Sequence, residues 1–264
     1  MPGPTPRKIK GFGWTPDLPD QRDYLFAAAP AVLSALPAKV DLRPKCPPVY
    51  DQGQLGSCTG NSIAGAIEFE RMKQNLSGAK TDVPSRLFIY YNERVIEGDV
   101  AQDNGAQIRD GIKSVAQLGV CFEAGPNSWP YDITKFASAP PAGCFTSALS
   151  NKVVQYSRLV QTVQQLKGCL AAGNPFVFGF TVYESFESPA VAKSGVVPMP
   201  ASGEKVVGGH AVVAVGYDDS KRRFIVRNSW GATWGQKGYF TIPYGYLTAS
   251  NLASDFWTIQ MVQP

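Results

Sequence analysis

The stretch DQGQLGSC (residues 51–58) is the most informative part of this chain, because its cysteine stands directly before a segment with helical periodicity. From Cys58 to Met72, apolar residues recur at the spacing of one helix face. A cysteine at a helix N-terminus lies beside unpaired N–H groups and the positive end of the helix dipole, which both favour the thiolate. Gly53 and Gly56 allow the backbone to turn tightly just before it. We therefore predict that Cys58 is a nucleophile.

Two later stretches supply the partners that a nucleophilic thiol needs. GGHAV (208–212) contains His210, the only histidine of the chain, at the expected start of a strand. NSWG (228–231) follows another strand-like run and contains Asn228 and Trp230. Attack of a thiolate on a carbonyl requires an imidazole that protonates the leaving group and a polar side chain that orients the ring. Cys58, His210 and Asn228 therefore form a candidate catalytic set.

Composition limits the other classes of function. The 264 residues are 44% hydrophobic and 17% charged, with a net charge of +4, and no basic stripe predicts nucleic-acid binding. With one histidine and no CxxC spacing among five cysteines, we expect no metal site and no other cofactor. No apolar run is long enough to predict a membrane span, and no secretion signal is recognisable. The sequence leaves two cellular locations open: the cytoplasm, or an exported location reached by another route.

The pattern of apolar residues changes near residue 150 and predicts an α+β fold with two lobes and a cleft between them. Residues 1–35 are a Pro-rich leader in which we expect little regular structure. Residues 36–150 form a mainly helical lobe with Gln52 and Cys58, and residues 151–264 form a mainly β lobe with His210 and Asn228. We expect helices over 58–72, 85–98, 107–119 and 162–172, and strands over 152–160, 176–183, 210–217, 223–228, 239–243 and 256–262.

The order Gln52, Cys58, His210 and Asn228-Ser229-Trp230 resembles the papain/cathepsin family of cysteine peptidases. In addition, LPAKVDLR (36–43) resembles the mature N-terminus of that family, and NSWGATWGQKGYF (228–240) resembles its asparagine block. The resemblance covers most of the chain, from residue 36 to residue 264. It implies a papain-like fold with a helical lobe, a β-barrel-like lobe and an active-site cleft between them.

The resemblance also implies a role for each matching residue. Cys58 would be the nucleophile and His210 the general acid and base, while Asn228 orients the imidazole and Trp230 shields that hydrogen bond from water. Gln52 would donate to the oxyanion beside the backbone N–H of Cys58. The expected substrate-binding residues are Gly105, Ala106, Gln107, Gly208 and Gly209.

Several positions depart from the family pattern. Leu55 replaces a cysteine three residues before the nucleophile, and Thr59 replaces an aromatic residue. Ala106 stands where a second glycine is usual, and Gln107 stands where an aromatic pocket wall is usual. Gln107, together with Gly208 and Gly209, predicts a roomy, partly polar pocket for the substrate residue two before the scissile bond. They bear on substrate preference and leave the chemistry intact.

The other cysteines, at positions 46, 121, 144 and 169, leave two interpretations open. They are buried thiols, or some of them form disulfides. If a pair forms, the family alignment points to Cys46 with Cys121, because both would lie in the helical lobe. Cys169 falls within a helical pattern and is expected to stay free.

The predicted function is that of a monomeric cysteine endopeptidase that hydrolyses peptide bonds of peptides or proteins through a thioester acyl-enzyme. Protein inhibitors are a further class of partner that the family allows; we expect neither nucleic acid nor membrane. Two alternatives remain: a non-proteolytic acyl transferase on the same fold, and a dormant protease-like binding module. The complete set of Gln52, Cys58, His210 and Asn228 favours the active peptidase.

The leader is too short and too rich in proline for the helical pro-region of the family. It nevertheless carries the apolar residues Phe12, Trp14, Tyr24 and Phe26, which predict docking onto a surface. Two placements are open. Either residues 12–18 lie in or beside the substrate groove and restrain activity, or the leader packs on the back of the molecule or is disordered.

Overall fold

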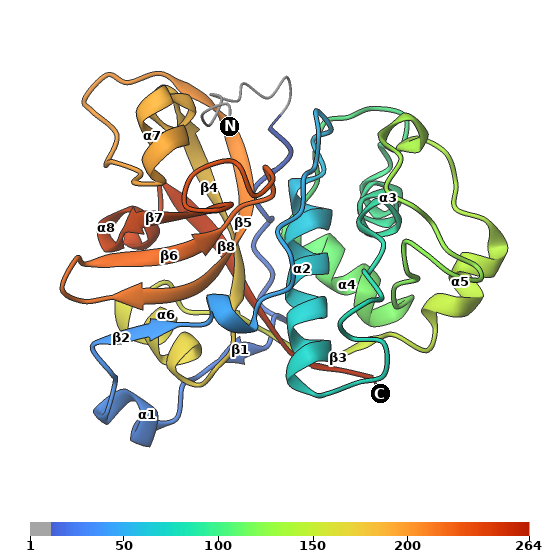
Figure 1. Cartoon of the computed structure of the whole chain (residues 1–264), viewed down its shortest axis with the longest axis horizontal. Helices are drawn as coiled ribbons and strands as arrows, with labels where there is room; N and C mark the ends of the chain where they lie inside the picture. Colours follow the sequence, from blue (N-terminus) through green and yellow to red (C-terminus); the bar gives the residue numbers. More distant parts are fainter. Residues whose placement is uncertain (1–11, 264) are drawn as a thin grey trace.

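A long central helix, α2 (Cys58–Lys73), forms the seam between the two sides of the protein in a computed structural model that describes residues 12–263 (Figure 1). The helix packs against α3 on one side and against β5 and β8 on the other. Residues Cys58 to Arg71 are buried without interruption, so the helix is covered all round and not along one face only. This position holds the N-terminal end of α2, and with it Cys58, between the two lobes.

The helical lobe contains the helices that the sequence predicts most clearly. Ser85 begins α3, and its hydroxyl accepts the Phe88 N–H, while Gly98 ends the helix in the left-handed conformation with φ 74°. The next helix ends at Gln117 with Leu118 as its C-cap, two residues before the expected end at Gly119. The helices and short 3₁₀ turns of this lobe are α3 (Arg86–Glu97), α4 (Ile108–Gln117), η2 (Ile133–Lys135) and α5 (Ala142–Ala148).

The other lobe is built on an eight-stranded sheet in the order β1-β3-β8-β4-β5-β6-β7, with β2 also paired to β5. Its strands are β1 (Leu25–Phe26), β2 (Lys39–Asp41), β3 (Val153–Leu159), β4 (Phe176–Tyr183), β5 (Val206–Asp218), β6 (Arg223–Arg227), β7 (Tyr239–Pro243) and β8 (Ala253–Val262). The remaining elements are α1 (Pro30–Ser34), η1 (Arg43–Lys45), α6 (Val163–Ala171), η3 (Glu184–Glu187), α7 (Pro189–Ser194) and α8 (Tyr244–Thr248). This arrangement is the papain-like α+β fold with two lobes.

The expected barrel-like closure of this lobe is wrong for the part of the chain that the structure describes. Of the strands, β1 pairs only with β3 and β7 only with β6, and beyond β7 there is just an isolated bridge from Thr241 to Val196. All neighbouring strands are antiparallel except β1 and β3. The sheet therefore stays open, and the core lies on its faces, where aromatic rings such as Phe178 and Phe256 stack at 5.5 Å.

His210 lies inside β5 and not at the start of a strand. Gly208 and Gly209 continue the strand before it and pair with Val182 and Thr181 of β4. Glycine is rare in strand interiors, so the sequence pattern places the strand start too late. The extension adds a main-chain edge beside the His210 imidazole.

The leader has more regular structure than expected and passes between the lobes. Within residues 12–35 it contains β1, which pairs with β3, and the short helix α1. Figure 1 shows its dark-blue trace running between α2 and the sheet. The leader is thus placed on the cleft side of the molecule.

The expected pairing of Cys46 with Cys121 is wrong, because all five cysteines are free thiols. Cys46 contacts Tyr239 of β7, on the sheet side. Cys121 instead forms a hydrogen bond with Cys144 inside the helical lobe. The two thiols of the expected pair lie in different lobes.

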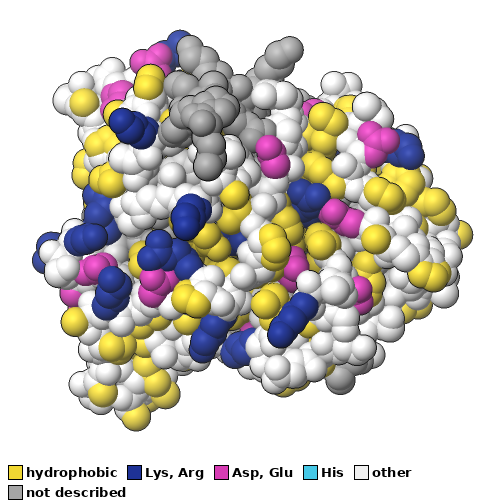
Figure 2. Space-filling view, in the orientation of Figure 1, with side chains coloured by type: hydrophobic (Ala, Val, Ile, Leu, Met, Phe, Trp, Pro, Cys, Tyr) yellow, Lys and Arg dark blue, Asp and Glu magenta, His cyan; other side chains and the backbone are white. Residues whose placement is uncertain are grey.

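No helix in residues 12–263 is long and apolar enough to cross a membrane. On the face shown in Figure 2, dark-blue Lys and Arg side chains are interspersed with magenta carboxylates and yellow apolar groups. Neither charge dominates that face.

Candidate active site

Cys58 lies where the two lobes meet. It is the first residue of α2, after the N-cap residue Ser57, and its side chain is fully buried. Its Sγ atom accepts a hydrogen bond from the backbone N–H of Ala211, at 3.3 Å. Ala211 follows His210 in β5, so the fold brings the predicted nucleophile next to the predicted base.

His210 and Asn228 are hydrogen-bonded through Nε2 and Oδ1 at 2.8 Å, and both side chains are buried. An amide oxygen only accepts, so this bond keeps a proton on Nε2. The Trp230 ring lies 5.2 Å from the imidazole and Phe180 lies 5.8 Å from it. Phe186 packs against Trp230 at 5.2 Å. Aromatic rings therefore exclude water from the His210–Asn228 bond. Nothing in the sequence distinguishes Phe180 and Phe186 from other core residues.

Gln52 is held by the loop that follows Asn228. Its Oε1 atom accepts the Ser229 hydroxyl at 2.6 Å, and its Nε2 atom donates to the Leu55 carbonyl at 3.0 Å. The backbone N–H of Gln52 donates to the Ser229 carbonyl, and Asp51 forms a β-bridge with Trp230. Ser229 thus positions the Gln52 side chain, a role that the sequence does not predict. In the sequence, Ser229 is marked only by its position between Asn228 and Trp230.

Burial dominates the electrostatics of Cys58 in this form of the protein. It raises the pKa of the thiol to about 12, although backbone N–H groups of Ala211, Gly13 and Thr59 act in the opposite direction. The buried carboxyl of Glu93 adds to the increase, and its own pKa is raised by burial. The thiol is therefore neutral here, in contrast to the thiolate favoured by its helix position.

The leader forms main-chain hydrogen bonds to both walls of the cleft. The Ala106 N–H donates to the Gly13 carbonyl at 2.8 Å, and the Thr15 N–H donates to the Ala106 carbonyl at 3.1 Å. From the other wall, the Gly209 carbonyl accepts the Trp14 N–H at 3.1 Å. Trp14 and Ala106 form a parallel β-bridge. Residues 13–15 therefore lie as an extended segment between the two lobes.

The remaining residues that we expected to contact substrate also lie against the leader. The Phe12 ring approaches two of the predicted site residues, with its centroid 6.2 Å from that of His210 and 6.5 Å from that of Trp230. Gly105 faces the Gly13 carbonyl, Gln107 Oε1 accepts the Leu18 N–H at 3.2 Å, and Gly208 lies against Phe12. All five expected substrate-contacting residues are thus covered by residues 12–18.

A sequence profile described as "papain family cysteine protease" matches residues 36–258. The chain belongs to that family. A peptidase C1-like protein of Acanthamoeba polyphaga mimivirus is 43% identical over 96% of this chain and 88% of its own length. Pro-cathepsin H of Mus musculus is 30% identical over 79% of this papain-family chain and 61% of its own.

A solved structure with high similarity is that of xylellain, a cysteine protease from Xylella fastidiosa. It is 46% identical, has a TM-score of 0.88, and covers 97% of this papain-family chain and 98% of the xylellain chain. Digestive procathepsin L 3 of Tenebrio molitor shares the fold at 20% identity, with a TM-score of 0.69 over 94% of this chain and 75% of its own.

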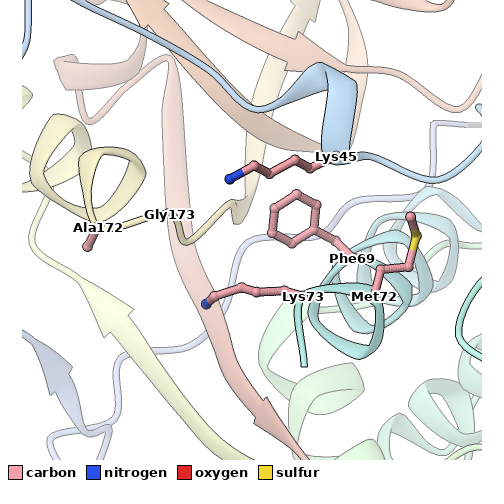
Figure 3. A pocket seen from close by; sticks show the side chains of 6 residues that line it. All are labelled: Lys45, Phe69, Met72, Lys73, Ala172 and Gly173. Carbon is pink, nitrogen blue, oxygen red and sulfur yellow. The ribbon is translucent and has the colours of Figure 1, made fainter. Parts of the chain in front are cut away.

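The far end of α2 borders a cavity of about 480 Å³. Lys45 and Lys73 extend beside Phe69 in this cavity (Figure 3). Lys73 already binds Glu70 and Asn174, at 3.0 and 2.6 Å. Phe69 and Lys73 follow Cys58 in the same helix, so this cavity lies about 17–22 Å from Cys58 along the axis of α2. It is therefore separate from the candidate active site. Among residues 12–263, no group of three His, Cys, Asp or Glu side chains could hold a metal ion.

Proposed function

We propose that this papain-family protein is a cysteine endopeptidase that cleaves peptide bonds through a thioester acyl-enzyme. The buried His210–Asn228 hydrogen bond beside Cys58 carries the proposal, because it orients an imidazole next to a thiol at a helix N-terminus. With the leader displaced, Cys58 transfers its proton to His210, and Sγ attacks the carbonyl carbon of the substrate. The carbonyl oxygen becomes an oxyanion that accepts hydrogen bonds from the Cys58 N–H and Gln52 Nε2.

Collapse of this intermediate breaks the C–N bond, and His210 gives its proton to the leaving amine. The product is a thioester between Cys58 and the acyl part of the substrate. Water then attacks the thioester while His210 accepts a proton, and the thiol leaves to regenerate the enzyme. Asn228 holds the ring throughout, and Ser229 holds Gln52 through its hydroxyl.

We propose further that residues 12–18 restrain this activity. The segment binds the main-chain groups of Ala106 and Gly209 that an extended substrate would need. It also donates a backbone N–H from Gly13 to Cys58 and contributes to the burial that keeps the thiol neutral. Displacement of the segment would expose both the groove and the nucleophile.

The test uses the full chain with Trp14→Ala, which loosens the leader, and the same chain with Cys58→Ala added. We expect the first protein to degrade a denatured protein substrate and to be inactivated by iodoacetamide at Cys58. The second should be inert. Labelling of Cys58 without any cleavage would instead support the dormant binding module, and acyl transfer to an added amine without hydrolysis would support the transferase.

Gln52→Ala tests the proposed oxyanion donor in the same background. Loss of one such donor lowers kcat by about 10²–10³ and changes KM far less, because the oxyanion exists only after attack. Steady-state kinetics on one fluorogenic peptide give both constants. An unchanged kcat would remove Gln52 from the site.

A further inference from the structure

The peptide unit between Leu55 and Gly56, just before the nucleophile, is held at both ends. Its carbonyl, that of Leu55, accepts a hydrogen bond from Gln52 Nε2 at 3.0 Å. Its N–H, that of Gly56, donates to both carboxylate oxygens of Asp103, each at 3.0 Å. The position of the Gln52 amide group therefore depends on the orientation of this peptide unit, and Asp103 fixes that orientation from the opposite end.

Asp103 also belongs to the wall of the cleft, because it lies in the loop between α3 and α4, two residues before Gly105. Tyr90 of α3 joins the two positions. Its hydroxyl donates to Asp103 Oδ1 at 2.6 Å and accepts the Gly105 N–H at 3.2 Å. Tyr90 is fully buried, and burial, followed by the hydrogen bond to Asp103, raises the pKa of its phenol. The hydroxyl therefore keeps the proton that it donates to Asp103.

Glycines make room for these contacts. A Cβ atom on Gly60 of α2 would lie 2.7 Å from the Arg86 carbonyl oxygen and 3.2 Å from Tyr90 Cβ, so α3 approaches α2 this closely only because Gly60 has no side chain. A Cβ atom on Gly56 would lie 2.9 Å from Asp103 Oδ1. All five cysteines are free, so no disulfide ties the loop of residues 52–57 to the helical lobe. That attachment relies on noncovalent contacts, and those to Asp103 have a charged acceptor.

We propose that Asp103 is a positioning residue for Gln52 and acts through the Leu55–Gly56 peptide unit. The inference rests on the proposed function, since it assumes that Gln52 stabilises an oxyanion. The amide nitrogen of Gln52 carries two hydrogens, of which the Leu55 carbonyl takes one and leaves the other for the oxyanion. A carboxylate that accepts from a peptide N–H also polarises the carbonyl of the same unit, which strengthens the bond from Gln52. Without Asp103, the unit can rotate and release the amide.

The first experiment uses the full chain with Trp14→Ala, so that the cleft is open, and adds Asp103→Ala. On one fluorogenic peptide, kcat should fall about ten- to a hundredfold, because a displaced donor loses much of its effect, and KM should change less than about threefold. Asp103→Asn keeps one accepting oxygen and should restore most of the lost kcat. Tyr90→Phe keeps the bonds between Asp103 and Gly56 and should lower kcat less than Asp103→Ala.

A neighbouring carboxylate supplies the matched control. Asp99 accepts a hydrogen bond from Asn104 Nδ2 at 2.7 Å, on the exposed side of the same loop. It has no contact with the Leu55–Gly56 peptide unit among the hydrogen bonds of residues 12–263. Asp99→Ala should therefore leave both kcat and KM unchanged.

Two measurements separate positioning from a general structural effect. Iodoacetamide reacts by displacement at a methylene carbon and forms no oxyanion, so the alkylation rate of Cys58 should change less than about twofold in Asp103→Ala. In a chain that already carries Gln52→Ala, Asp103→Ala should lower kcat by less than about a further threefold, because the donor through which it acts is gone. Equal losses of kcat with and without Gln52, or equal losses of kcat and alkylation rate, would overturn the proposal.

Hydrogen exchange of the Gly56 amide, followed by NMR, tests the contact without turnover. Asp103→Ala should speed this exchange about tenfold or more, and Asp99→Ala should leave it unchanged. Unchanged exchange and unchanged kcat in Asp103→Ala would overturn the role of Asp103 and leave the peptidase intact. A Trp14→Ala chain that cleaves no peptide would overturn the peptidase and with it this role, and faster exchange in Asp103→Ala would then show a purely structural attachment.

Discussion

The two halves of the described leader are held in different ways. Residues 12–16 lie in the cleft and are attached by main-chain hydrogen bonds to Ala106 and Gly209 and by one inserted indole. Residues 17–26 are tied to the body through a buried ion pair between Asp23 and Arg109, at 2.6 Å, and through the pairing of β1 with β3. The first half resembles a bound ligand, and the second half resembles part of the fold.

The difference matters because the two kinds of attachment require different free energies to break. A single hydrogen bond contributes about 0.5–1.5 kcal/mol, and it can be exchanged for one with water or substrate. Removal of one partner from a buried ion pair leaves a charge without compensation and costs about 3–5 kcal/mol. We therefore expect the cleft segment to leave while residues after Asp17 stay in place.

Asp23→Ala should have the largest effect and tests the second half. It removes the carboxylate that both Arg109 and Arg158 contact, and it leaves buried positive charge. The free energy of unfolding should fall by about 3–5 kcal/mol in denaturant titrations. Asp20→Ala removes ion pairs with the exposed Arg22 and with Lys113; it is the control and should move the midpoint far less. An unchanged midpoint for Asp23→Ala would show that this half is not part of the fold.

Trp14→Ala should have the next largest effect and tests the first half. Without the indole, the cleft segment detaches more often and Cys58 becomes accessible. The rate of Cys58 alkylation in the native protein should rise about ten- to a hundredfold, with little change in the unfolding midpoint. Peptide mapping separates Cys58 from the other cysteines. If the midpoint falls as far as in Asp23→Ala, the two halves are one cooperative unit and the comparison fails.

The sequence predicts local features of this molecule better than its long-range contacts. Cys58 at a helix start and the helix from Ser85 to Gly98 follow from spacing and caps within a few residues of each other. The hydrogen bond from the Ser229 hydroxyl to Gln52 joins residues 177 positions apart, so no local sequence pattern predicts it. The same holds for the hydrogen bond from the Trp14 indole to Asp255. These contacts depend on how the lobes close on each other, which a motif does not encode.

Asp17 offers a smaller and more specific test at the junction of the two halves. Its carboxyl accepts hydrogen bonds from the Arg109 N–H at 3.0 Å and from Trp257 Nε1 at 2.9 Å. Burial, followed by the neighbouring Asp255, raises the pKa of Asp17 from 3.8 to about 6 in the docked leader. A pKa raised on docking means that the protonated form binds more tightly. Docking is therefore strongest below about pH 4 and weakens as pH rises through about 6.

The measurement compares the wild-type chain with Asp17→Asn, which stays neutral at every pH. Ionisation of Cys58 enters both alkylation rates equally, so their ratio reports only the docking of the leader. We expect the ratio of wild type to variant to be near one at about pH 4 and to rise several-fold between about pH 5 and about pH 7. A control with Asp20→Asn in place of Asp17→Asn should give a flat ratio, because Asp20 is bound to the exposed Arg22. A flat ratio for Asp17→Asn as well would show that this carboxyl does not change its proton affinity on docking. A ratio that falls with pH would mean that the hydrogen bonds to the Asp17 carboxylate and the nearby charge of Arg109 outweigh burial, and that acid rather than base loosens the leader.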